Sequence, residues 1–166
     1  MRSTTRSRTL SLGLLLAAAA AQAAGTVQVS YVQPEQFADA GDARRDQEGN
    51  LRTLTRHLEA LAGRHLGDGQ TLRIEVLDVD LAGEVRPVLR LHQDVRVLKG
   101  SADWPRIKLR YTLESTGQAP RHGETTVADL AYLQRINRYH GNESLRYEKR
   151  MLDDWFSAQF AAASAR

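Results

Sequence analysis

Apolar and polar side chains alternate over several short stretches of the chain, which is the pattern of β-strands with one buried face. The clearest stretch is Thr71–Asp80, where Leu72, Ile74 and Val76 fall on one side and charged residues fall on the other. Similar patterns predict further strands at Thr26–Val32, Asp94–Leu98, Ile107–Leu113 and Ala119–Val127. The last two are expected to form a hairpin across a Ser-Thr-Gly turn.

A spacing of three and four residues between apolar positions predicts two main helices. The first, Gln47–Leu66, carries leucines at positions 51, 54, 58 and 61 on one stripe, and the glycine-containing segment 67–69 ends it. The second follows Gly141, and its broad apolar face consists of Leu145, Leu152, Trp155, Phe156 and Phe160. Because large aromatic side chains dominate cores, we expect this helix to contribute much of the hydrophobic core.

Two segments are harder to interpret. Pro87 interrupts any central strand over residues 85–93, because proline has no backbone N–H to donate. Leu130, Leu133 and Ile136 have helical spacing and predict a short helix over Asp129–Asn137. The element order lacks regular strand–helix alternation. We therefore expect an α+β fold, with a mostly antiparallel or mixed sheet of about four to five strands and the two main helices packed on one face.

The N-terminus has the three parts of a secretory signal peptide. Arg2, Arg6 and Arg8 make the start positive, and no acidic residue occurs before Glu35. A stretch of almost pure Leu and Ala over residues 10–21 leads to a small-residue Ala-Gln-Ala exit. This predicts residues 1–23 as a signal peptide, cleaved within a residue or two of Ala23, and residues 24–166 as a single exported domain. The alternative is an uncleaved membrane anchor.

Composition narrows the possible functions. The formal charge of the whole chain is +3, but the predicted mature domain carries 20 basic and 20 acidic residues and is neutral. Nucleic-acid-binding domains usually carry excess positive charge, so we do not expect a nucleic-acid partner. The chain has no cysteine, which excludes disulfides, zinc–thiolate sites, cysteine nucleophiles and a lipoprotein anchor. No later apolar run approaches the roughly 20 residues of a membrane span.

The segment Asp78–Glu84 is the first candidate for chemistry. Asp78 and Asp80 are two residues apart in a predicted strand, so both carboxylates project from one face, and Glu84 could join them across the Gly83 turn. Three acids could bind a divalent cation or share a proton, although their spacing does not match a calcium-binding loop. The competing interpretation is that the two aspartates lie on a solvated strand face or accept backbone N–H bonds in the following turn.

Other chemical signals are weak. Trp104 could be an exposed anchor for a partner, or it could cover the end of the core. The five histidines show no metal-ligand spacing, and the sequence contains neither a nucleophile elbow nor a phosphate-binding glycine loop. We therefore expect no catalytic residues, metal or cofactor from the known motifs, and enzymatic activity stays undecided but disfavoured.

Four segments together carry a family resemblance. They are PEQFAD at 34–39, DVDLAGE at 78–84, WPRIKLRY at 104–111 and YEKRMLDDWF at 147–156. With them the chain resembles the bacterial family catalogued as domain of unknown function 3016, from about Thr26 to Phe160. The resemblance implies a small exported protein of Gram-negative bacteria. It implies no activity and no binding residues.

These observations lead to two functional hypotheses. The first is a non-enzymatic periplasmic module that binds another component of the cell envelope, most simply a protein. The alternative is a small hydrolase or cation-binding protein that uses Asp78, Asp80 and Glu84. A purely structural or stress-accumulated protein would have the same sequence features as the first. Ligand identity and oligomeric state stay open.

Overall fold

A four-stranded mixed sheet forms the centre of the computed structural model, which describes residues 25–88, 93–100 and 102–160. Its strands, in spatial order, are β1 (Thr26–Tyr31), β2 (Gln70–Asp80), β5 (Arg106–Ser115) and β6 (Arg121–Ala128). β1 pairs with β2 in parallel, and the other two pairings are antiparallel. The predicted strands and the α+β class are confirmed.

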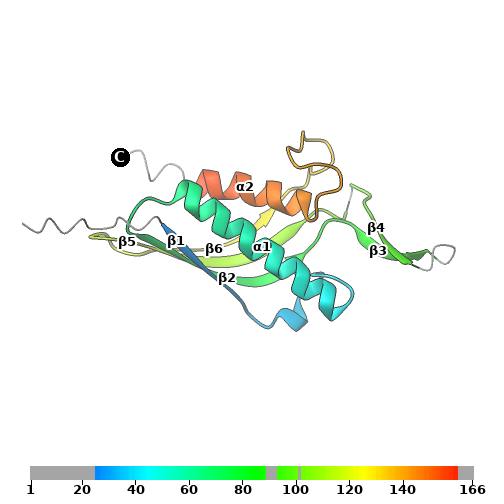
Figure 1. Cartoon of the computed structure of the whole chain (residues 1–166), viewed down its shortest axis with the longest axis horizontal. Helices are drawn as coiled ribbons and strands as arrows, with labels where there is room; N and C mark the ends of the chain where they lie inside the picture. The colour runs from blue at the N-terminus through cyan, green and yellow to red at the C-terminus, as the bar shows by residue number, and fades with distance from the viewer. Residues whose placement is uncertain (1–24, 89–92, 101, 161–166) are drawn as a thin grey trace, which may run out of the picture.

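Two helices cover one face of this sheet and leave the other face open (Figure 1). They are α1 (Arg44–His65) and α2 (Arg146–Phe160). The leucine stripe of α1 and the aromatic face of α2 are buried against inward-facing residues of the strands, including Leu72, Ile74 and Leu109. Phe156 is fully buried and Phe160 nearly so, which confirms that α2 contributes much of the core. A short 3-10 turn, η1 (Pro34–Gln36), follows β1.

Pro87 is accommodated in a separate two-stranded ribbon. β3 (Glu84–Val88) pairs antiparallel with β4 (Gln93–Val97) and projects away from the helices (Figure 1). Each strand of this ribbon has only one neighbour, so the missing N–H of Pro87 can face the open side. Of residues 85–93, for which no clear prediction could be made from the sequence, residues 85–88 therefore belong to a strand. Residues 89–92 lie outside the described residues.

The predicted helix over Asp129–Asn137 is wrong, because this segment consists of turns. The Asp129 carboxylate accepts the N–H of Ala131 at 3.1 Å, and the Gln134 N–H bonds to the carbonyl of Ala131 at 2.9 Å. Such local bonds compete with the helical ladder. Tyr132 is buried at the same time, while the three apolar residues with helical spacing lie outside the core.

The predicted signal peptide, residues 1–23, lies outside the described residues. Within the part of the chain that the structure describes, no helix has the length and apolar character needed to cross a membrane.

Candidate functional site

The two aspartates of the acidic segment share a face of β2, as their spacing predicts. A bulge at Leu77 shifts the alternation, so that Val79 faces the core and the two aspartates face away from it. Each has a different partner. The Asp78 carboxylate accepts the N–H of Ala38 at 2.9 Å, whereas Asp80 forms an ion pair with Arg106. Burial raises the pKa of Asp80, and the Arg106 charge opposes that rise without cancelling it.

Glu84 lies apart from the aspartates, at the start of the β3–β4 ribbon. Its carboxylate accepts hydrogen bonds from Lys99 at 2.5 Å and Arg86 at 3.1 Å, which hold its pKa below the usual value. Among the described residues, no group of three His, Cys, Asp or Glu side chains is placed to hold a metal ion. The three acids are therefore partnered one by one and do not form a shared site.

The turn between the two sheets, residues 81–83, is held by charged side chains that are partly or fully buried. Arg96 donates to both carboxylate oxygens of Asp39, at 2.7 and 3.2 Å, and to the carbonyls of Ala82 and Gly83. Glu148, at the start of α2, accepts the Ala82 N–H at 2.7 Å. Burial raises the pKa of Glu148, with this hydrogen bond and Arg96 acting in the opposite direction. These contacts join the turn to α2 and have a structural role.

Trp104 is half-buried and belongs to a small second core beyond the end of the main one. It packs with Leu98 against Ala82, Tyr132 and Tyr147, and the two tyrosine rings meet edge to face at 4.9 Å. The indole therefore covers the end of the core, which is the second of the two interpretations given above.

The largest exposed apolar side chains of the described residues lie together in sequence on the loop between β6 and α2. We call Leu130, Leu133 and Ile136 the apolar loop surface. Their exposed fractions are 62%, 42% and 96%. Single exposed aliphatic residues are common, whereas several exposed aliphatic residues on one loop make that loop a candidate interaction site.

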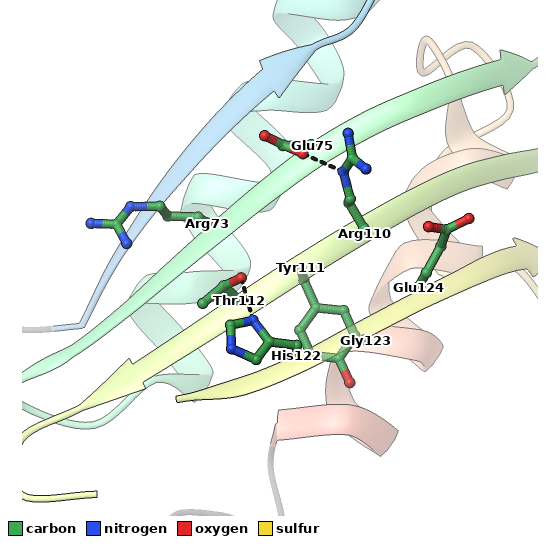
Figure 2. A pocket seen from close by; sticks show the side chains of 8 residues that line it. All are labelled: Arg73, Glu75, Arg110, Tyr111, Thr112, His122, Gly123 and Glu124. Atoms are coloured by element: carbon green, nitrogen blue, oxygen red, sulfur yellow. Dashed lines mark hydrogen bonds and ion pairs between the residues drawn. The ribbon is translucent and has the colours of Figure 1, made fainter. Parts of the chain in front are cut away.

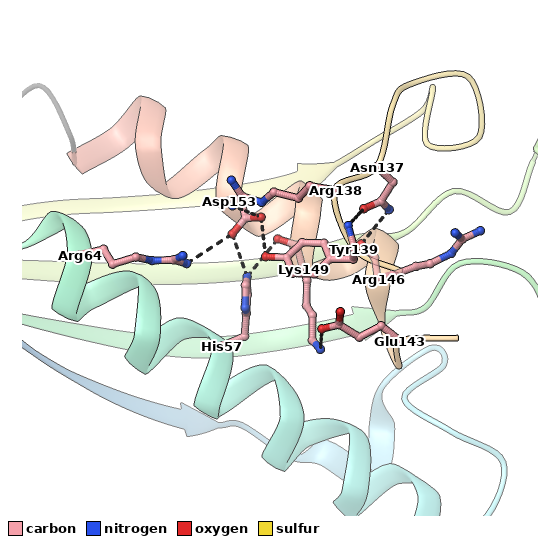
Figure 3. A network of polar contacts seen from close by, with 9 residues as sticks. All are labelled: His57, Arg64, Asn137, Arg138, Tyr139, Glu143, Arg146, Lys149 and Asp153. Atoms are coloured by element: carbon pink, nitrogen blue, oxygen red, sulfur yellow. Dashed lines mark hydrogen bonds and ion pairs between the residues drawn. The ribbon is translucent and has the colours of Figure 1, made fainter. Parts of the chain in front are cut away.

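A polar network centred on the buried carboxylate of Asp153 holds the end of this loop against both helices (Figure 3). We call His57, Arg138, Tyr139 and Asp153 the Asp153 network. The Tyr139 hydroxyl donates to the buried carboxylate of Asp153 at 2.7 Å, and Arg138 forms an ion pair with the same group. His57 of α1 places Nε2 3.0 Å from Asp153 Oδ1, but its N–H is directed at the Lys149 carbonyl, 3.1 Å away.

The electrostatics of the Asp153 network favour a charged carboxylate. Burial alone raises the pKa of Asp153, but its polar contacts with His57, Tyr139 and Arg138 outweigh burial and lower the pKa below the usual value. Burial, reinforced by the bond to Asp153, raises the pKa of Tyr139 to about 12. Tyr139 therefore stays a hydrogen-bond donor at physiological pH.

The beginning of the loop is held as firmly as its end. Asp129 is buried, caps the first turn, and lies 3.7 Å from Arg135 and 3.9 Å from Arg150. The buried Tyr132 donates its hydroxyl to Asp103 at 3.0 Å. The loop is thus fixed at both ends by polar groups, and its aliphatic side chains point out of the core.

A second candidate is a shallow hollow of about 440 Å³ on the open face of the sheet (Figure 2). Its charged side chains are paired with one another or with neighbours on the same face: Arg110 with Glu75, Arg73 with Glu114, and Glu124 with Lys108. Thr112 and His122 share a 2.9 Å hydrogen bond. Side chains that are about half exposed and already paired offer a ligand little uncompensated charge.

Sequence patterns could find only part of this site. The spacing of Leu130, Leu133 and Ile136 is visible in the sequence, but it predicted a helix and not an exposed loop. The Asp153 network gives no sequence signal, because His57, Tyr139 and Asp153 come from three distant segments.

A family model described as "Protein of unknown function (DUF3016)" matches residues 25–158, which confirms the resemblance inferred from the four sequence segments. No curated protein matches the chain significantly.

Proposed function

We propose that this chain, which belongs to the DUF3016 family, is exported to the periplasm and there binds another envelope protein through the apolar loop surface. This proposal assigns it no reaction. The export part rests on the signal-peptide pattern of residues 1–23, and the binding part rests on the structure of the loop.

The observation that carries the binding proposal is that the fold holds three aliphatic side chains in solvent. Ile136 is 96% exposed although both ends of its loop are fixed by buried polar groups. Exposing apolar side chains to water is unfavourable in free energy, and burying them against a partner would remove this cost. Fully burying one such side chain contributes about 1.5–3 kcal/mol, so Ile136 alone would change a dissociation constant by about 10–150-fold.

The binding test compares two variants of one loop. A photo-crosslinking residue next to the apolar loop surface is introduced into the full chain, and crosslinked products are identified by mass spectrometry from intact cells. Ile136→Asp should abolish the main crosslink to an envelope protein. Gln134→Asp, which adds the same charge at an exposed polar position, should leave that crosslink in place. Equal crosslinking by both variants would show that the loop is not the docking surface.

Export is tested separately. Cells expressing the full chain are fractionated, and the N-terminus of the accumulated protein is sequenced. We expect a periplasmic protein that begins within a residue or two of Ala24. A full-length chain in the cytosol would refute export.

A further inference from the structure

The outer edge of β1 has no strand partner among the described residues. The Val32 N–H bonds to the Val76 carbonyl at 2.9 Å, so even-numbered residues of β1 direct their backbone groups to β2. Because these directions alternate along a strand, the N–H and C=O groups of Val27, Val29 and Tyr31 point outward. Three donors and three acceptors are therefore available in one row.

Within the described residues, β1 itself carries none of the sequence features that usually protect an edge against strand addition. β1 has the sequence TVQVSY, without charge, proline, glycine or bulge. The opposite edge strand, β6, has the sequence RHGETTVA, with charges and a central glycine. Exposed edges normally carry charges, prolines or bulges, because an unprotected edge pairs with other strands. The contrast indicates that the β1 edge is used for pairing.

The helix above this edge adds a second contact surface. α1 runs alongside β1 in Figure 1, and residues of both line a hollow of about 380 Å³. Tyr31, Leu51 and Thr55 are among its lining residues, and the Tyr31 hydroxyl bonds to the Leu51 carbonyl at 2.8 Å. Four charged residues of α1 line the hollow as well: Glu48, Arg52, Arg56 and Glu59.

We propose that two copies of this chain form a symmetric dimer by antiparallel pairing of their β1 strands, with the two-fold axis at Val29. In this register Val29 lies opposite Val29 of the second copy, and Val27 lies opposite Tyr31. All three outward-facing residues then exchange both of their hydrogen bonds. Moving the axis by one residue leaves one of the three unpaired on each strand. The result is a continuous eight-stranded sheet with both α1 helices on the same face.

The charges of α1 fit the same register. Tyr31 lies level with about position 53 of α1, because its hydroxyl contacts both Leu51 and Thr55. Val29 lies about 6.6 Å earlier along the strand, which corresponds to about four or five residues further along the antiparallel helix. The axis therefore passes between Arg56 and Glu59, and two-fold symmetry places Arg56 of each copy opposite Glu59 of the other.

This complementarity favours a second copy over an unrelated extended peptide as the occupant of the edge. Arg56 and Glu59 are both exposed, so they are free to reorient across the axis. The β1 edge and the apolar loop surface belong to opposite ends of the strand order. The dimer is thus independent of the proposed function.

The test is a charge exchange followed by measurement of molar mass. The full chain is purified from cells in the form that accumulates and studied by light scattering and sedimentation at about 10–100 μM, where a micromolar dimer would be populated. We expect the mass of two chains. Arg56→Glu and Glu59→Arg should each give monomers, because each places like charges opposite one another, and the double variant should restore the dimer.

Two controls keep the result interpretable. Arg45→Glu changes the net charge as Arg56→Glu does, but lies about 19 Å from the axis along α1, so it should leave the dimer intact. Circular dichroism should show the same melting behaviour for monomeric variants at low concentration as for the parent chain. A monomeric parent chain at every concentration, or a double variant that stays monomeric, would overturn the proposal.

Discussion

The bond from Tyr139 to Asp153 should stabilise the fold measurably, and Tyr139→Phe removes it without changing the shape of the ring. The hydroxyl donates to a carboxylate that is 5% exposed, at 2.7 Å. Hydrogen bonds to charged groups contribute about 1.5–3 kcal/mol, and a buried carboxylate that loses a donor cannot regain it from water. We therefore expect the free energy of unfolding to fall by about 1.5–3 kcal/mol. The melting temperature should fall by about 5–12 °C.

The same bond makes a pH-dependent prediction. The contacts lower the native pKa of Asp153 below its unfolded value. The stability that they provide is therefore complete above about pH 4, and it is lost as the pH falls through the native pKa. The difference between parent and Tyr139→Phe should be constant from pH 7 to pH 5 and should shrink below pH 4.

Urea denaturation from pH 7 to below pH 4 measures the free energy of unfolding of each variant and its dependence on pH. Tyr132→Phe is the matched control, because its hydroxyl bonds to Asp103, which keeps its backbone donors at Lys99 and Gly100. We expect a smaller loss of about 0.5–1.5 kcal/mol for this control. A loss for Tyr139→Phe below about 0.5 kcal/mol, or effects of Tyr139→Phe and Asp153→Asn that simply add in the double variant, would refute the reasoning.

Three further predictions concern other parts of the fold. Burial raises the native pKa of Glu148, so the stability linked to its protonation is present at low pH and lost as the pH rises. Glu148→Gln should therefore gain stability relative to the parent from pH 4 to pH 8, whereas a difference constant over that range would contradict it. Gly123→Ala places a Cβ 2.6 Å from the Tyr111 ring and should cost about 1–3 kcal/mol in chemical denaturation; an unchanged midpoint would show that the ring moves freely. Millimolar Ca²⁺ or Mg²⁺ should leave the melting temperature unchanged, because the acids of segment 78–84 have separate partners; a rise would revive a cation site there.

The elements that could be predicted from the sequence are those in which apolar residues recur on the buried face. Leu72, Ile74 and Val76 alternate because one face of β2 packs on helices and the other meets solvent. The loop containing Leu130 violates this rule, because its apolar residues are exposed although they repeat with helical spacing. Periodicity alone cannot distinguish a side chain that faces the core from one that faces solvent. In this loop the local hydrogen bond of Asp129 favours a turn over a helix.

The candidate site was harder to predict because it depends on tertiary contacts. Asp78 and Asp80 do share a face, as their spacing requires, but the spacing does not reveal that Ala38 and Arg106 satisfy them. The bulge at Leu77 is also invisible in the sequence, since both flanking segments alternate normally. Which groups a charged residue contacts depends on the tertiary fold, so the local sequence around Asp78 and Asp80 does not reveal their partners.

α2 follows every strand of the sheet in the chain, and this order has a consequence for folding. Until α2 is synthesised, the inward faces of β5 and β6 have no cover, and Leu109 and Leu113 are left facing water. Phe156 and Phe160, which complete that core, come after every strand of the sheet in the chain. The main core therefore closes only after α2 has been synthesised, so the strands made earlier depend on this helix for their final packing.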